Sequence, residues 1–173
     1  LQMNAVVKKI YHDSGIRFIF STRSATPFIL DEKGNKIFDS KNGYTFIPGK
    51  DEVIREGKDG YVVSYGELLY RCLDAVERLR KEGIMVGLIN KPTLNVPDEK
   101  MLQKVGASPF VLFVESQNKK SGFGNRYANW MLERGLKPTW AHLAATKPGQ
   151  GGIYEHIPYQ GLGPDDIKKK ILE

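Results

Sequence analysis

The sequence of 173 residues contains one cysteine, three histidines and no long apolar run. A single cysteine, Cys72, excludes a disulfide within the chain and is typical of a reducing, cytoplasmic compartment. No apolar stretch approaches the roughly 20 residues of a membrane-spanning helix. The first ten residues, LQMNAVVKKI, lack the pattern of a signal peptide. The composition therefore predicts a globular cytoplasmic protein with no membrane partner.

Several motifs that would identify an enzyme class are also absent. The sequence has no G-x-G-x-x-G dinucleotide fingerprint and no G-x-x-x-x-G-K-[ST] phosphate loop. It has no G-x-S-x-G nucleophile elbow. His12, His142 and His156 have no metal-like spacing with each other or with acidic residues, so no metal site is predicted. Cys72 lies on the apolar face of a predicted helix, which favours a small core residue over a nucleophile.

The net charge of +6 is compatible with an anionic partner. The basic residues are scattered along the sequence, however, and the densest cluster is the run from Lys168 to Lys170. This distribution favours a solvated basic surface over a nucleic-acid site.

Regular alternation of strands and helices begins after Gly60. Short β-rich or apolar segments predict strands, and segments with apolar residues at helical spacing predict helices. The clearest helix is ELLYRCLDAVERLRKEG, with apolar residues on one face and Gly83 at its end. The predicted strands are 61–66, 84–90, 109–115 and 138–144, and the predicted helices are 67–83, 97–106, 123–135 and 164–173.

This β-α-β-α-β-α-β-α order predicts an α/β fold, a three-layer arrangement with a mainly parallel, twisted sheet and helices on both faces. Ligands of such sheets bind outside the carboxyl ends of the strands. The corresponding segments here are 64–66, 90–93, 115–124 and 144–152.

The first sixty residues follow a different pattern. Residues 4–12 predict a helix and residues 16–20, IRFIF, predict a buried strand. Residues 31–60 are rich in Gly, Asp and Lys, and they predict an irregular connector with a short extended piece, YTFI, inside it. This connector is the expected domain boundary.

A candidate anion or interface loop follows the third strand of the regular region. Gly122 and Gly124 in SGFGNR would let backbone N–H groups face an anion at a helix N-terminus, with Arg126 beside them. A flexible turn that lets the helix pack closely is the simpler interpretation. Glu115 ends a buried strand, where an acid either bonds nearby backbone, crosses an interface or acts in catalysis. His156 lies in a glycine-rich loop that would cover an interface or a pocket, and His142 is expected to be packed and hydrogen-bonded.

Five segments, in order, resemble the transketolase family. GIRFIFSTRSATPFI resembles the end of the pyrimidine-binding domain, and YTFIPGKDEVIREGKDGYVVSYG resembles the linker that follows it. ELLYRCLDAVERLRKEGIMVGLIN, KPTLNVPDEK and FVLFVESQNKKSGFGNRYANWML resemble successive parts of the third domain. Related families are deoxyxylulose-phosphate synthase and the E1 β-subunits of oxoacid dehydrogenases. The resemblance implies a tail of a pyrimidine-binding domain at 1–30, a linker at 31–59 and a transketolase C-terminal-like α/β domain at 60–173.

The resemblance implies a role for Arg23. It matches the family arginine that binds the phosphate of the sugar-phosphate substrate, and a guanidinium suits phosphate oxygens. The proline that usually follows that arginine is Ser24 here, so the turn departs from the family pattern. In the intact enzyme, the family uses thiamine diphosphate with Mg²⁺ or Ca²⁺ to transfer a two-carbon ketol unit between sugar phosphates.

The family's G-D-G…N motif for metal and diphosphate is missing from these residues. We therefore expect no catalytic residue and no cofactor in this chain alone, and we expect it to be inactive by itself. The chain is expected to be a fragment of a longer protein or a naturally short relative, and the first residue, Leu1 rather than Met, favours the fragment. The expected partners are the missing pyrophosphate- and pyrimidine-binding domains, within a homodimer. Two alternatives stay open: a stand-alone, non-catalytic binding or regulatory module, and a subunit of a multi-chain thiamine-dependent enzyme.

Overall fold

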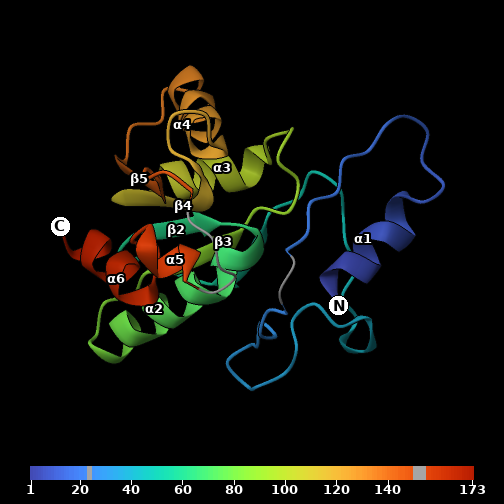
Figure 1. Ribbon diagram of the computed structural model, residues 1–173, viewed down its shortest axis with the longest axis horizontal. Coiled ribbons are helices and arrows are strands. Elements are labelled where there is room, and N and C mark those ends of the chain that lie inside the picture. The colour runs from blue at the N-terminus through green and yellow to red at the C-terminus, as the bar shows by residue number, and fades with distance from the viewer. Residues whose placement is uncertain (23–24, 150–154) are drawn as a thin grey trace.

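The computed structural model describes residues 1–22, 25–149 and 155–173. Figure 1 shows a layered α/β body from which an N-terminal arm extends. We use "arm" for residues 1–30. No helix in the described ranges is long and apolar enough to cross a membrane.

Five strands form one mixed, mostly parallel sheet in the order β1-β3-β2-β4-β5. β2, β3, β4 and β5 run parallel to one another, whereas the edge strand β1 pairs antiparallel with β3. The central strands are apolar because helices cover both faces of the sheet. The strands are β1 (Glu52–Arg55), β2 (Tyr61–Ser64), β3 (Gly87–Asn90), β4 (Phe110–Asn118) and β5 (Thr139–Ala145).

The helices form two outer layers (Figure 1). One layer contains α2 (Leu69–Lys81), α5 (His156–Tyr159) and α6 (Pro164–Leu172), and the other contains α3 (Glu99–Gly106) and α4 (Phe123–Glu133). Alternation along the strands supplies both cores. Val62 and Leu112 pack against the α2 layer, whereas their neighbours Val63 and Phe113 pack against α3 and α4. The predicted α/β class and its three layers are thus confirmed.

Local sequence chemistry explains where the helices begin. The side chain of Asp98 caps α3 by accepting a hydrogen bond from the N–H of Met101. Pro164 stands at the start of α6, and Asp166 accepts from the N–H of Gly163 at 3.0 Å. The predicted helices 67–83, 97–106, 123–135 and 164–173 are therefore found with shifted ends, and the first starts as a 3-10 turn, η2 (Gly66–Leu68).

Two predictions for the first sixty residues are wrong. Residues 16–20 form no strand, and the side chains of Ile16, Phe18 and Phe20 are more than 80% exposed. β-rich composition does not make a strand unless a neighbouring strand accepts its hydrogen bonds, and none of the described segments pairs with this one. The connector at 31–60 is not wholly irregular, because it contains β1. β1 has only four residues and lies among charged ones, so the sequence gives no clear signal that it pairs with β3.

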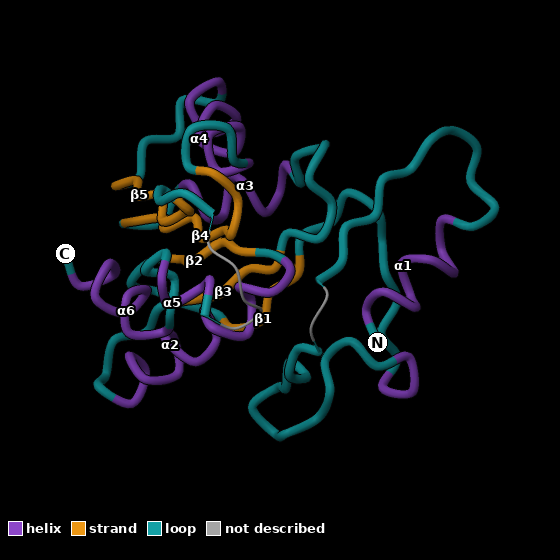
Figure 2. Tube along the Cα trace, in the orientation of Figure 1, coloured by secondary structure: helices purple, strands orange, loops and turns teal. Residues whose placement is uncertain are grey.

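The arm contributes little to the core. The helix α1 (Gln2–Ile10) has no buried residue. The tube in Figure 2 shows a long loop region between α1 and β1. The 3-10 turn η1 (Ser40–Asn42) interrupts it. The YTFI segment, predicted to be extended, has no regular secondary structure. Its Phe46 is nevertheless buried.

Candidate functional site

Glu115 lies at the carboxyl edge of the sheet, and its side chain is fully buried. We use "edge cluster" for Glu115 of β4 and the four residues that surround it, which come from the end of β2, the middle of β5 and the start of α4. These four are Tyr65, Gly122, Gly124 and His142. The parallel pairing of β4 with β2 and β5 brings these residues together.

The carboxylate of Glu115 accepts four hydrogen bonds. The donors are the hydroxyl of Tyr65 at 2.6 Å, Nε2 of His142 at 2.8 Å, and the N–H groups of Phe123 at 2.9 Å and Gly124 at 2.8 Å. Burial opposes ionisation, but these bonds outweigh it and hold the pKa of Glu115 below its ordinary value. Burial and the nearby carboxylate raise the pKa of Tyr65, which therefore stays a proton donor.

The helix N-terminus that the sequence offers for an anion is thus occupied by an anion from the same chain. The first N–H groups of α4 are donated to Glu115, a favourable placement for a carboxylate. His142 is buried and hydrogen-bonded, as expected. Because its members bond one another, the edge cluster joins three strands and a helix.

Glycine is required twice in the edge cluster because the backbone approaches Glu115 and His142 closely. A Cβ on Gly122 would lie 2.3 Å from Oε1 of Glu115, and a Cβ on Gly124 would lie 2.5 Å from Nε2 of His142. Both distances are far shorter than a van der Waals contact.

We expect Gly124→Ala to lower the free energy of unfolding by about 1–3 kcal/mol, because the methyl group displaces His142 from Glu115. Urea unfolding of both proteins measures this difference. Gly149→Ala is the matched control, since a Cβ there meets no atom within 4 Å. An equal loss in both variants would contradict the close packing of the edge cluster.

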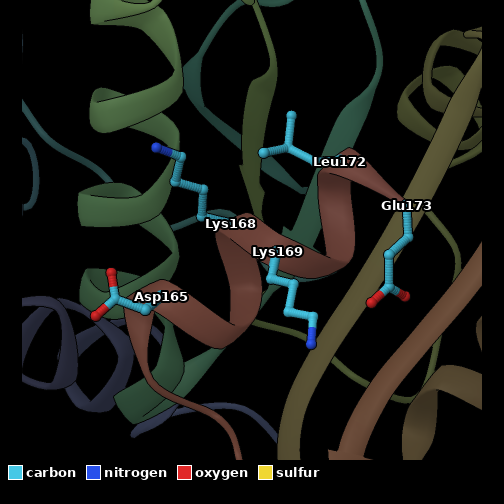
Figure 3. Close-up of a pocket in the computed structure, with 5 residues that line it drawn as sticks. All are labelled: Asp165, Lys168, Lys169, Leu172 and Glu173. Atoms are coloured by element: carbon cyan, nitrogen blue, oxygen red, sulfur yellow. The ribbon is translucent and has the colours of Figure 1, made fainter.

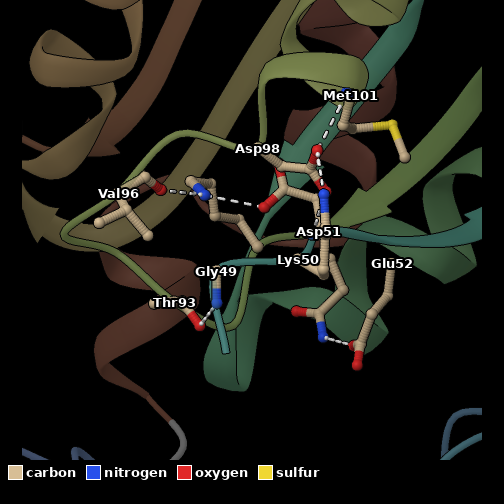
Figure 4. Close-up of polar contacts among 10 residues, drawn as sticks. Gly49, Lys50, Asp51, Glu52, Thr93, Val96, Asp98 and Met101 are labelled. Carbon is tan, nitrogen blue, oxygen red and sulfur yellow. Dashed lines mark hydrogen bonds and ion pairs between the residues drawn. The ribbon is translucent and has the colours of Figure 1, made fainter. Parts of the chain in front are cut away.

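A second polar site fastens the linker to the loop after β3 (Figure 4). We use "linker clasp" for the contacts between residues 49–52 and 90–98. The N–H of Gly49 donates to Oγ1 of Thr93 at 3.0 Å, and the N–H of Asp51 donates to Oδ2 of Asp98 at 3.1 Å. At the start of β1, Nδ2 of Asn90 donates to Oε2 of Glu52 at 2.7 Å. The clasp thus fixes the point where the linker joins the sheet.

The centre of the linker clasp is a buried ion pair. Nζ of Lys91 lies 2.7 Å from Oδ1 of Asp51, and the two side chains are 0% and 1% exposed. Lys91 also donates to the carbonyl of Val96 at 3.0 Å and faces the ring of Trp130. Burial raises the pKa of Asp51 to about 6, although Lys91 opposes the shift. The second carboxylate oxygen of Asp51 has no hydrogen-bond partner among the described residues.

The other predicted site residues do not join the edge cluster where the structure describes them. Arg23 lies outside the described residues. Arg126 is on the exposed face of α4, one turn from the edge cluster. His156 begins α5, and its Nδ1 is buried without a hydrogen-bond partner in the described ranges. Of the predicted residues that the structure describes, only Glu115, Gly122 and Gly124 come together.

Sequence analysis did not identify Tyr65, Asp51 or Lys91 as site residues. Lys91 carried a usable signal, because a lysine that directly continues a buried strand needs a counter-ion. Asp51 is remote in sequence, and only the antiparallel pairing of β1 with β3 brings it to Lys91.

No part of the described chain gathers three or more His, Cys, Asp or Glu side chains that could hold a metal ion. One surface depression is lined only by residues from α6 and the C-terminus (Figure 3). A second is lined by residues between 31 and 54. Neither includes a residue of the edge cluster, whose hydrogen bonds join β2, β4, β5 and α4.

Comparison with known proteins agrees with this fold. Residues 49–167 match the family model described as transketolase, C-terminal domain. The chain belongs to the transketolase C-terminal domain family. The match begins in the linker clasp and includes every strand of the sheet.

Two curated relatives show which part of a transketolase-family protein this is. A Methanocaldococcus jannaschii protein, described as a transketolase C-terminal section on a provisional basis, is 27% identical over 139 residues. That alignment covers 79% of this chain and 43% of the relative. One of the subunits of apulose-4-phosphate transketolase from Actinobacillus succinogenes is 31% identical over 97 residues, which cover 56% of this chain and 31% of the relative. The chain therefore spans less than half of either relative.

A solved structure described as a split gene transketolase, inactive beta4 tetramer, has the same fold. It superposes with a TM-score of 0.74 at 21% identity, over 87% of this chain and 46% of that chain. The chain is thus related to transketolase-family C-terminal sections and to split subunits.

Proposed function

We propose that this chain is the C-terminal section, or the C-terminal part of a split subunit, of a transketolase-like transferase that depends on thiamine diphosphate. The assembled enzyme would transfer a two-carbon ketol unit between sugar phosphates. The observation that carries the proposal is an apolar arm, exposed at Ile16, Phe18 and Phe20, beside a domain that matches the family model. Such a surface requires apolar neighbours that the described chain does not supply.

In this proposal the arm completes a pyrimidine-binding domain. Residues 1–30 would be the tail of that domain, 31–59 the linker and 60–173 the C-terminal domain. The linker clasp would then hold the two domains in a fixed relation, because it fastens the linker next to β1. Homodimerisation would follow the family pattern.

The residues of this chain do not fit the cofactor. The family's G-D-G…N motif is absent, and the carboxylates of Asp51 and Glu115 are already bound within the fold. Thiamine diphosphate and its Mg²⁺ or Ca²⁺ would be held by the missing domains. Arg23 would contribute a guanidinium to the phosphate of the substrate in the assembled enzyme.

We expect the purified chain to show no transketolase activity and to become part of an active complex when combined with a polypeptide that carries the missing domains. Measuring ketol transfer with and without that polypeptide checks this. Replacing Phe18 and Phe20 with serine should weaken assembly in sedimentation experiments, because both side chains are exposed in the arm. Leu132→Ser is the control, since Leu132 is an exposed apolar residue on α4.

Arg23 is tested in the same assembled enzyme. Arg23→Ala should raise KM for a sugar phosphate by about tenfold or more, as expected for a lost charged hydrogen bond, whereas Arg126→Ala should not. Transketolase activity of the purified chain alone would overturn the proposal. Unchanged assembly after Phe18 and Phe20 are replaced with serine would also overturn it.

The split-subunit form is favoured by the names of two similar proteins, one a subunit of a transketolase and the other a split gene transketolase. A stand-alone anion-binding module is less well supported, because Glu115 already takes the first N–H groups of α4.

A further inference from the structure

One region has a large excess of positive over negative charge. Between Glu115 and Glu155 the sequence has a single acidic residue, Glu133, against six basic ones. The six are Lys119, Lys120, Arg126, Arg134, Lys137 and Lys147. The chain as a whole has a net charge of +6, so this asymmetry is large.

The turn between β4 and α4 gathers three of these cations. We use "basic turn" for Lys119, Lys120 and Arg126. Nδ2 of Asn125, the neighbour of Arg126, donates to the carbonyls of Lys119 and Lys120 at 2.8 and 3.1 Å. All three cationic residues are exposed, and none of their side chains has a hydrogen bond or an ion pair within the described ranges.

The backbone of this turn is held firmly, although its cations are not neutralised. The N–H of Lys119 donates to the carbonyl of Ala145 at 2.8 Å, which extends the pairing of β4 with β5. The N–H of Lys120 donates to Oδ1 of Asn118 at 2.9 Å, and the N–H of Gly122 donates to the carbonyl of Asn118 at 2.6 Å. A fixed backbone lowers the entropy lost when a partner binds.

In the α2 layer, by contrast, several basic side chains form ion pairs with carboxylates of the same chain. Arg78 pairs there with Asp74 and Asp165, and Lys168 pairs with Glu82. Among the residues that the structure describes, no carboxylate pairs with the basic turn, so a partner that supplied carboxylates would make new ion pairs.

The chemistry of the basic turn favours a protein over other anions. A small anion needs convergent donors, but the N–H groups of Phe123 and Gly124 are already bound to Glu115. Single-stranded nucleic acid needs exposed rings for base stacking, and the nearest ring, Phe123, packs against Phe113 and Tyr65. Duplex nucleic acid is bound through many phosphate contacts, more than three cations provide.

We propose that the basic turn is a docking surface for an acidic face of a partner protein, whose carboxylates pair with Lys119, Lys120 and Arg126. The turn leads into α4, which lies well apart from α1 (Figure 1). This surface is therefore separate from α1 of the arm. The proposal goes beyond the proposed function and does not depend on it.

A labelled oligoglutamate peptide is a direct probe of this surface. We expect it to bind the full chain in fluorescence anisotropy, with an affinity that falls as salt is raised. Replacing Lys119, Lys120 and Arg126 with serine should weaken binding by about tenfold, as expected for three exposed ion pairs. The control replaces Lys33, Lys41 and Lys58 with serine, which removes the same charge from other exposed positions. Binding by this control should match the unmodified chain.

Three results would overturn the proposal. Equal weakening in both triple variants would show that only net charge matters. Displacement of the labelled peptide by inorganic pyrophosphate, at a concentration well below the concentration of free glutamate that displaces it, would indicate a small-anion site. Tighter binding of a single-stranded oligonucleotide with the same number of charges would indicate nucleic acid. Urea unfolding of each variant shows that the fold is retained, and none of these results bears on assembly through the arm.

Discussion

Lys91→Met should lower the free energy of unfolding by about 3–5 kcal/mol at neutral pH, which is the usual cost of removing one partner from a buried ion pair. The loss follows because the side chain of Asp51 is 1% exposed, and without Lys91 the carboxyl group must either carry an unpaired buried charge or take up a proton. Methionine fills much of the volume of lysine, so the effect measures charge rather than a cavity. Urea unfolding at constant protein concentration gives the difference.

Acid should reduce this loss. Burial places the pKa of Asp51 at about 6 in the fold, above its ordinary value of 3.8, so the folded state binds the proton more tightly than the unfolded chain. The stability contributed by this group therefore falls as pH rises from about 4 to 6. Without Lys91 the folded pKa rises further, so Lys91→Met should cost less at about pH 5 than at neutral pH.

The double variant Asp51→Asn with Lys91→Met supplies the decisive control. It has no buried charge at either position, so it should recover most of the stability that Lys91→Met loses. Asp74→Asn breaks an exposed pair with Arg78 and should change stability little. If Lys91→Met is harmless, or if Asp51→Asn deepens its loss, the linker clasp does not depend on this pair.

Glu115→Ala should lower the free energy of unfolding by at least about 3 kcal/mol, because four donors lose their only shared acceptor inside the protein. Tyr65 and His142 would remain buried or partly buried with unbound polar atoms. Glu115→Gln keeps the shape but turns an amide group toward donors, so an intermediate loss is expected. Glu133→Gln, at the exposed end of α4, is the matched control.

The pH dependence of Glu115 has the opposite sign to that of Asp51. Its folded pKa lies below the ordinary value of 4.5, so its stabilising contribution is complete above about pH 4.5 and is lost as pH falls through the folded pKa. The unmodified chain should therefore lose its advantage over Glu115→Gln in acid. A constant difference between the two proteins down to about pH 3 would contradict the assignment of a bound carboxylate.

The body of the fold could be predicted from the sequence because its signals are local. Leu69, Cys72, Val76 and Leu79 recur at helical spacing, and all of them are buried in α2. The nearly unbroken apolar run of β4 is likewise typical of a sheet that is covered on both faces. These elements follow from period and composition alone.

The wrong and missed predictions share one cause, because each of these features depends on contacts with residues that are distant in the sequence. IRFIF has the composition of a strand, but a strand exists only where another strand pairs with it. β1 is the reverse case, since an undistinguished EVIR segment becomes a strand because β3 presents an unpaired edge. The same reason explains the candidate sites. Glu115 and its glycines are close in sequence and could be found, whereas the pairing of Asp51 with Lys91 depends on the fold.

The exposed arm also has a consequence for the life of the protein in the cell. During synthesis the arm leaves the ribosome before the sheet can form, and its exposed side chains Ile16, Phe18 and Phe20 find no apolar neighbours in the described domain. Chains that have not met their partner would keep this loosely held segment within reach of chaperones and proteases, which act on accessible apolar segments. Under the proposed function, the amount of this protein would then follow the amount of its partner, with no regulator other than degradation.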